Sequence, residues 1–269
     1  MNAERALLQR LIAGPATGDA LAVESGHTRA AVWKRIDALR MAGVGIEARA
    51  GRGYALSQPL ELLDADVIVS RLSKQSRARI AQLKIEWSID STNSELLRQP
   101  TPADGASILL AERQTGGRGR RGRAWASPLA ANIYLSLARH YSAGLARLSG
   151  LSLVAGVATA RALHAMGFDR IGLKWPNDIV VVGEDGMRKL GGILVEGGGE
   201  HAGPVRAVIG LGLNVRMPAD CDAAIDQPWT DLSALTDRAV QRNEVAAAVL
   251  AQWLPALDRF DAEGLAPFL

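Results

Sequence analysis

Apolar positions recur at helical spacing three times near the N-terminus. They predict helices over residues 4–13 and 19–24. A third helix is expected to begin after Thr28, a good N-cap, and to end at Gly43. One face of this third helix carries the apolar stripe Val32, Ile36 and Leu39. The stripe predicts that the third helix packs against the first two.

From residue 46 to 56 the pattern changes to alternating apolar and polar positions around Gly51-Arg52-Gly53. This alternation predicts a two-stranded hairpin with a cationic tip. Helix, helix, turn, helix and basic hairpin is the order of a winged helix-turn-helix, whose third helix reads DNA. A three-helix bundle with solvated charges fits the same pattern, so both interpretations stay open here. The residues that the stripe leaves exposed on the third helix are Arg29, Trp33, Lys34, Asp37 and Arg40.

Two stretches of sequence in this region favour the DNA-binding interpretation. The stretch TRAAVWKRIDALRMAGV, followed by GRGYAL, resembles the DNA-binding domain of bacterial biotin operon repressors. The resemblance implies contacts to operator DNA from the third helix and the hairpin tip. The residues carried over are Thr28, Arg29, Lys34, Arg35 and Arg52.

Beyond Ser57-Gln58-Pro59 the periodicity is interrupted, and a helical connector over residues 60–72 restarts at Asp64. We therefore expect two domains, residues 1–60 and 61–269. In the second domain, strand-like apolar runs alternate irregularly with helical segments. The runs cover residues 83–89, 107–112, 132–137, 171–175, 179–182, 193–196 and 206–215, and the helices lie near 94–98, 148–166 and 243–263. This order predicts an α+β domain with a mixed sheet and helices on one side.

Composition limits the class of protein further. With 269 residues and 48% hydrophobic content, the chain can bury one large core and a small one. The net charge is only +3, but the cations gather in a few segments, which favours anionic partners. One cysteine excludes an internal disulfide, and the four histidines show no metal-ligand spacing, so we expect no metal site built by the protein. No apolar run is long enough for a signal or membrane segment, and we expect a soluble cytoplasmic protein without membrane contact.

Residues 114–123 combine four arginines with glycines directly after an apolar run. Gly117, Gly119 and Gly122 formally match G-x-G-x-x-G, but the arginine neighbours and the nearby Pro128 argue against a dinucleotide-binding helix. No glycine-rich turn closes with G-K-[ST], which argues against a P-loop. A loop of this composition is suited to wrapping a phosphate and a carboxylate together. A solvated basic turn or an RGG-like nucleic-acid segment is the alternative.

Two further groups of polar and charged residues lie before and after this loop in the sequence. Lys174-Trp175-Pro176-Asn177-Asp178 ends a strand, and Lys189 precedes the double glycine at 191–192, where a ligand can approach the backbone. In the segment 90–94, hydroxyls and amides precede a helix; capping explains one of them, and binding of a small polar ligand explains the rest.

Together with Gly210-Leu211-Gly212-Leu213-Asn214, these segments resemble the catalytic domain of biotin protein ligases, in order and over nearly the whole chain. The resemblance implies a class II synthetase-like fold with a mixed sheet and packed helices. The implied biotin-binding residues are Ser91, Thr92, Asn93, Gln114, Gly117, Arg118, Gly119, Arg120, Lys189, Gly192 and Gly210. The implied nucleotide-binding residues are Arg121, Arg123, Trp125, Asn177 and Asn214, and the implied catalytic residues are Lys189, Arg118, Arg120 and Asp178.

The same resemblance implies a reaction and its partners. Biotin and ATP, with Mg²⁺, form biotinyl-5′-AMP, and the biotin passes to a lysine of the biotin carboxyl carrier protein of acetyl-CoA carboxylase. Ligand binding promotes a homodimer that represses biotin synthesis genes at operator DNA. Many relatives continue into an SH3-like barrel after the position of Leu269, and we expect that domain to be absent.

Two alternatives remain. A lipoate ligase or octanoyltransferase has the same catalytic fold, but the transferase needs an activated cysteine, and Asp220 and Asp222 beside Cys221 disfavour a thiolate. The second alternative is a non-catalytic repressor that senses biotin. The retained Lys189 and loop arginines argue against it, because a sensor does not need charges that compensate an anionic transition state.

Overall fold

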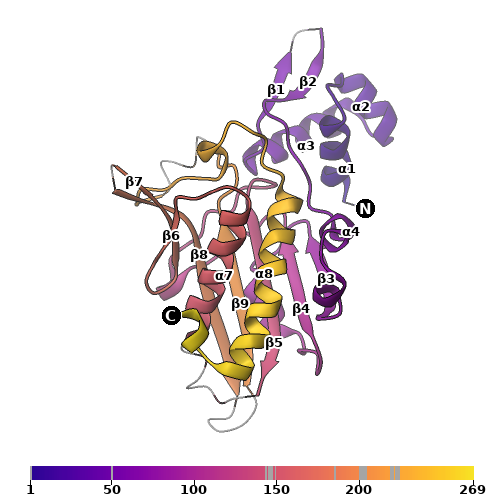
Figure 1. Cartoon of the computed structure of the whole chain (residues 1–269). Helices are drawn as coiled ribbons and strands as arrows, with labels where there is room; N and C mark the ends of the chain where they lie inside the picture. The colour runs from indigo at the N-terminus through magenta and orange to yellow at the C-terminus, as the bar shows by residue number, and fades with distance from the viewer. Residues whose placement is uncertain are drawn as a thin grey trace.

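The computed structural model describes residues 2–49, 51–142, 144, 148, 150–184, 186–199, 205–218, 221 and 225–269. The N-terminal part is a winged helix (Figure 1), with α1 Ala3–Ile12, α2 Gly18–Ser25, α3 Arg29–Met41, β1 Ile46–Arg49 and β2 Gly53–Leu56. The three predicted helices and the hairpin are confirmed.

Side-chain caps define where these helices start. Asn2, Thr17 and Thr28 each accept a hydrogen bond from a backbone N–H in the first turn of α1, α2 and α3. Thr28 therefore caps α3 as predicted, with Oγ1 3.2 Å from Ala31 N. The predicted stripe Val32, Ile36 and Leu39 is buried. The opposite face of α3 is therefore exposed to solvent.

The wing is fixed to the helices at its base. Ala16 and Tyr54 exchange backbone hydrogen bonds of 3.0 and 2.8 Å, which adds a short third strand to β1 and β2. Gly53 has a φ of +77°, and a Cβ there would lie 2.3 Å from the Ala16 carbonyl oxygen, so only glycine fits. The predicted cationic tip includes Arg52, which is exposed; its neighbour Ala50 lies outside the described residues. The wing projects away from the rest of the molecule (Figure 1).

A seven-stranded sheet forms the centre of the second part. Its order is β3-β4-β5-β9-β8-β7-β6; β3 and β4 are parallel and the other pairs are antiparallel. The strands are β3 Ile80–Glu86, β4 Ala106–Ala111, β5 Ile133–Tyr141, β6 Ile171–Lys174, β7 Asp178–Gly183, β8 Gly186–Gly199 and β9 Val205–Leu213. All seven predicted strands are present, and the sheet is mixed as expected.

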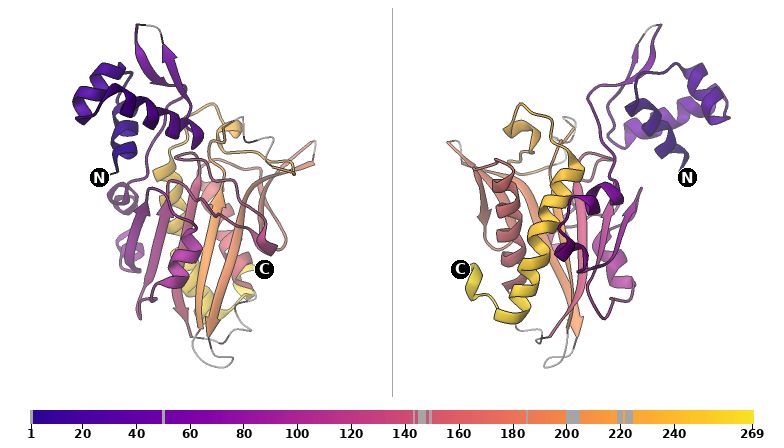
Figure 2. Two further views of the ribbon diagram at one scale, coloured as in Figure 1. Left: turned by 180° about the vertical axis from the view of Figure 1, so that it is seen from behind. Right: turned by 45° about the vertical axis from the view of Figure 1, so that its right-hand side comes forward.

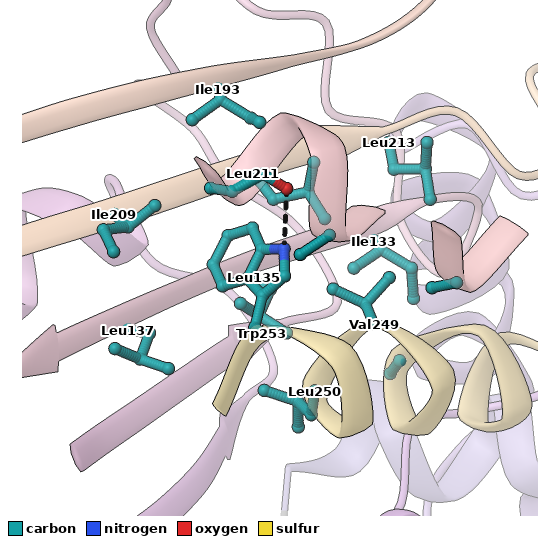
Figure 3. Close-up of a cluster of buried hydrophobic side chains, with 14 of the residues drawn as sticks. Ile133, Leu135, Leu137, Ile193, Ile209, Leu211, Leu213, Val249, Leu250 and Trp253 are labelled. Carbon is teal, nitrogen blue, oxygen red and sulfur yellow. Dashed lines mark hydrogen bonds between the residues drawn. The ribbon is translucent and has the colours of Figure 1, made fainter. Parts of the chain in front are cut away.

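Two long helices, α7 Leu151–Ala165 and α8 Arg242–Glu263, lie together on one face of the sheet (Figure 2). Trp253 of α8 packs among apolar residues of β5 and β9 (Figure 3). Its indole N–H donates to Thr159 Oγ1 of α7 at 2.8 Å, so the largest buried side chain ties both helices to the sheet. The short helices α4 Ala65–Ser70 and α5 Lys74–Arg77 contact α8.

The prediction that the helices lie on one side of the sheet is wrong for α6 Thr92–Arg98. Leu96 of α6 packs with Leu109 and Val208, whose neighbours along β4 and β9 belong to the core beneath α7 and α8. Successive strand residues point to opposite faces, so α6 covers the other face. This face is turned toward the viewer in the left panel of Figure 2.

A buried polar network holds the segment that follows the winged helix to the sheet. Arg242 at the start of α8 pairs with Glu112 after β4 at 2.7 Å, and both side chains are less than 5% exposed. Arg242 also donates to the Glu61 carbonyl, and Glu112 accepts from the Leu63 N–H at 2.6 Å. The connecting segment is therefore held to the sheet by hydrogen bonds.

None of the helices in the described part of the chain combines the length and the apolar character that a membrane span requires.

Candidate functional site

A cavity of about 900 Å³ lies between the start of α6, the arginine-rich loop and the ends of strands β6 to β9. Every residue that the resemblance implies for biotin, nucleotide or catalysis lines it, except Gly117. These residues are Ser91, Thr92, Asn93, Gln114, Arg118, Gly119, Arg120, Arg121, Arg123, Trp125, Asn177, Asp178, Lys189, Gly192, Gly210 and Asn214. Segments separated by more than a hundred residues thus meet in one space.

Glycines form one wall of this cavity. A Cβ on Gly210 would lie 2.3 Å from Asn93 Oδ1, and a Cβ on Gly212 would lie 2.4 Å from the Trp125 ring. These contacts are far closer than real Cβ atoms allow, so the strands must lack side chains there for the opposite residues to approach. Gly117 does not line the cavity. Its carbonyl accepts a hydrogen bond from Trp125 N at 2.9 Å, which fixes the end of the arginine-rich loop.

The polar end of the cavity is a network of oriented groups. Ser91 caps α6, as predicted for one residue of its segment. Gln114 Oε1 accepts from both the N–H and the hydroxyl of Thr92, at 2.8 and 3.1 Å. Asn93 donates to Glu196 Oε2 at 2.8 Å, and its Oδ1 lies 2.6 Å from Ser136 Oγ. Such a network offers a small polar ligand groups whose direction is already set.

The arginine-rich loop closes on itself beside this network. Gly119 N donates to the Arg123 carbonyl at 2.8 Å, around a short turn in which Arg121 has a φ of 57°. Arg118 donates to Ser94 Oγ at 2.7 Å and pairs with Glu196 at 3.1 Å. No α-helix begins within the loop where it is described, in agreement with the argument against a dinucleotide-binding fold.

Lys189 of β8 brings a cation to the glycine wall of the cavity. Its Nζ lies 2.8 Å from Asp178 Oδ1 and 5.6 Å from the centroid of the Trp125 ring. Asp178 and Lys189 belong to paired strands whose register shifts between Ile179 and Val180. A bulge of this kind redirects side chains, and it places the lysine over the glycine wall.

Trp125 contributes an unused donor. Its Nε1 is buried and, within the described part of the chain, has no hydrogen-bond partner. The indole lies against Gly212 and Gly192 and below Lys189. A buried donor without a partner is costly, and a ligand acceptor in the cavity is one way to satisfy it.

A magnesium ion bound with nucleotide needs few protein ligands, because phosphates and water supply most of its coordination. Among the described residues, no group of three or more His, Cys, Asp and Glu side chains forms a metal cage. Asp178 and Asp226 line the cavity and offer carboxylate oxygens. The residues present therefore fit a magnesium ion that is held mainly by phosphate oxygens.

The comparisons with known proteins agree with this geometry. Residues 86–214 match the Biotin/lipoate A/B protein ligase family, and residues 4–55 match an HTH domain. The bifunctional ligase/repressor BirA of Salmonella typhimurium is 40% identical over 253 residues, which cover 94% of this chain and 76% of the relative. The chain belongs to the BirA family of bifunctional ligase/repressors. BirA of Escherichia coli is 39% identical over 253 residues, which cover 94% of this chain and 75% of the relative.

Solved structures place the fold in the same family. A biotin protein ligase from Aquifex aeolicus in complex with biotin and ATP is 28% identical, with a TM-score of 0.57. The match covers 70% of this chain and 75% of that one. The α+β class and the family resemblance expected from the sequence are therefore confirmed.

Sequence reasoning misses several residues that line this cavity or support it. Ser136 and Glu196 hold Asn93, but each lies in a strand that carries other polar or charged residues, so neither stands out in the sequence. Trp175 lines the cavity with 82% of its surface exposed, and Trp229 lines it beyond β9. A serine between apolar residues of a strand buried on both faces is the signal available for Ser136; Glu196 is half-buried in a strand with exposed glycines and has no such signal.

The predicted DNA contacts of the BirA-family winged helix lie on α3 and its N-cap, apart from Arg52 at the tip of the wing. Thr28, Arg29, Lys34 and Arg52 are exposed, and Arg35 is half-buried. Arg29 pairs with Asp19 at 3.2 Å, in an ion pair about 70% exposed on both sides. An exposed pair of this kind is weak and leaves the cation available to a phosphate.

Proposed function

We propose that this chain activates biotin with ATP to biotinyl-5′-AMP and transfers biotin to a lysine of the biotin carboxyl carrier protein of acetyl-CoA carboxylase. The observation that carries this proposal is the convergence of Lys189 and Asp178 with the arginine-rich loop in one cavity, beside the polar network of α6. In this proposal residues 61–269 are the ligase unit and residues 1–60 the DNA-binding unit, and the protein works in the cytoplasm.

The first step brings two anions together. Two unit charges about 4 Å apart repel by roughly 4 kcal/mol at an effective dielectric constant of about 20. Lys189, Arg118 and Arg120 supply cations that offset this repulsion and stabilise the charge that moves onto the leaving pyrophosphate. Magnesium, when bound with the nucleotide, supplies further charge compensation.

The remaining residues position the substrates. Thr92, Asn93 and Gln114 present donors and acceptors to the biotin ring, while Trp125 and Asn214 line the nucleotide side. In the second step the Asp178 carboxylate orients or deprotonates the incoming lysine amine. Unchanged transfer in Asp178→Asn, measured from preformed biotinyl-5′-AMP, would argue against this role.

Regulation follows from the same loop. An arginine-rich loop that is ordered by the adenylate can pack against a second subunit, and a symmetric dimer presents two winged helices to a palindromic operator. We expect biotin and ATP to promote this homodimer and repression of biotin synthesis genes. Equal monomer populations in sedimentation experiments with and without both ligands would contradict the expectation.

Biotin-dependent ATP–pyrophosphate exchange tests the catalytic proposal without an acceptor protein. We expect Lys189→Ala to lower exchange on the order of 10²- to 10³-fold, as expected for loss of one group that stabilises transition-state charge. Lys84→Ala is the matched control, because Lys84 is an exposed lysine on strand β3. Absence of exchange in a folded, biotin-binding wild type would instead favour a non-catalytic, biotin-sensing repressor.

A further inference from the structure

A second concave surface lies in the winged helix, between α3 and the wing. Its volume is about 500 Å³. Helix α3 contributes Arg29, Ala30 and Trp33, and the wing contributes Ala48, Arg49 and Tyr54. We refer to these six residues as the helix–wing cleft. An arginine and an aromatic ring stand on each of its two walls.

Trp33 is the unusual member of this cleft. It is 55% exposed, although α3 already has a complete buried stripe. Trp33 follows Arg29 by four residues and therefore lies on the same side of the helix, facing the wing. The indole thus contributes little to the core of the winged helix and has a large apolar surface left for a partner.

The charges around Trp33 indicate what kind of partner fits. Arg29 pairs with the exposed Asp19, and Arg49 pairs with Glu47 at 3.2 Å, where both side chains are about half exposed. Phosphate groups compete readily for cations held in such weak pairs. A cleft with a cation on each wall and an apolar ring beside them suits a DNA strand, whose phosphates flank its bases.

We infer that Trp33 determines base specificity by packing its indole against the C5-methyl group of a thymine in the major groove. Arg29 and Arg49 hold the phosphates of the strand that crosses the helix–wing cleft. This inference rests on the proposed binding of operator DNA by the winged helix. A helix in the major groove distinguishes thymine through its methyl group, which only an apolar contact can read. Ala30 beside Trp33 leaves room for the base edge.

The test uses the full chain with biotin and ATP and a library of random DNA duplexes at fixed salt. We expect the wild type to enrich a motif with an invariant thymine in each half-site. Trp33→Ala should lose the preference for that A·T pair by roughly tenfold, in the range that one base-pair mismatch costs. Met41→Ala is the control, because Met41 is 81% exposed on α3 but lies outside the cleft.

Replacing the selected thymine by deoxyuridine removes only the methyl group. The wild type should bind this duplex roughly tenfold more weakly, whereas Trp33→Ala should bind both duplexes equally well. Arg49→Ala should weaken binding to all sequences alike and lower the salt dependence. Amide protection of α1 to α3 in hydrogen exchange should be unchanged in Trp33→Ala, which shows that the winged helix of the variant is folded. Biotin-dependent ATP–pyrophosphate exchange should also be unchanged.

The outcomes separate the inference from the function on which it rests. If the wild type enriches no sequence, binding of operator DNA fails, and the inference fails with it. If the wild type enriches a motif but binds thymine and deoxyuridine duplexes equally, DNA binding stands and the role of Trp33 is overturned. An unchanged motif in Trp33→Ala overturns it as well. If Trp33→Ala binds no duplex, the wild-type comparison of the two duplexes still decides.

Discussion

At the scale of single residues, the cavity depends on positions that lack a side chain. Gly210→Ala would place a Cβ 2.3 Å from Asn93 Oδ1. Asn93 is buried and held by Ser136 and Glu196, so it cannot move aside without breaking those hydrogen bonds. We expect biotin to bind roughly 10- to 100-fold more weakly, since one or two hydrogen bonds of about 1 to 1.5 kcal/mol each are lost or misdirected.

Calorimetric titration with biotin measures this loss directly. Gly198→Ala on the neighbouring strand β8 is the matched control, because a Cβ there meets no atom within 4 Å. Unchanged biotin affinity in Gly210→Ala would show that Asn93 does not shape the biotin site.

The same residues show how far a sequence can predict a site. The motifs around Ser91, Arg118 and Lys189 are local, so their resemblance to a family can be seen in the chain itself. Ser136 reaches the site only because β5 pairs with β9 in one register, and Glu196 reaches it only through β8. Register depends on contacts distant in sequence, and a single polar residue in a strand does not reveal it.

At the scale of elements, helix α6 is held at both ends by one side chain. Arg98 in its last turn donates to both carboxylate oxygens of Asp90, at 2.9 Å each, and also pairs with Glu95. Asp90 lies just before the helix, and its carbonyl accepts from Gly116 N at the start of the arginine-rich loop. Arg98 therefore links the two ends of α6 close to the cavity.

This link lowers the pKa of Asp90 from its ordinary value of 3.8 to about 2, mainly through the hydrogen bonds from Arg98. Because the pKa is lower in the folded state, the stabilisation is complete above about pH 4 and is lost as the pH falls through about 2. In Arg98→Met we expect the Asp90 pKa to return toward 3.8, as measured by NMR titration of the carboxyl carbon. Arg259→Met, which removes another exposed arginine that pairs with a glutamate, should leave it unchanged. An unaltered Asp90 pKa in Arg98→Met would assign the shift to another cause.

Element prediction succeeds where burial produces continuous apolar runs. It finds β4, β5 and β9 because both faces of these strands are covered. It finds only residues 193–196 of β8, which extends over Gly186–Gly199, because glycines and charged residues interrupt the apolar run. Helix α5 is missed because a single polar turn has no detectable period.

At the scale of the whole molecule, the winged helix packs against the second part of the chain. Its core includes Leu129 and Ala130, which follow the arginine-rich loop. Leu129 N donates to the Ala42 carbonyl at the end of α3 at 2.8 Å, and Trp87 Nε1 donates to Glu4 of α1 at 3.2 Å. The segment that leaves the cavity thus completes the core of the DNA-binding part.

Leu129→Ala tests whether this contact stabilises the winged helix. Leu129 is only 3% exposed, and removing a buried leucine typically costs about 2 to 5 kcal/mol. Since Leu129 belongs to the same buried cluster as residues of α1 to α3, we expect amide exchange to accelerate in those helices and to change little in β5 and β9, as measured by hydrogen exchange with mass spectrometry. Val182→Ala, at a half-exposed position on β7, controls for loss of apolar surface alone. Equal protection of α1 to α3 in Leu129→Ala and the wild type would mean that the winged helix does not depend on Leu129 for its stability. Faster exchange would mean that the segment after the arginine-rich loop is part of the winged-helix core, so that a change in this loop reaches α3 through Leu129.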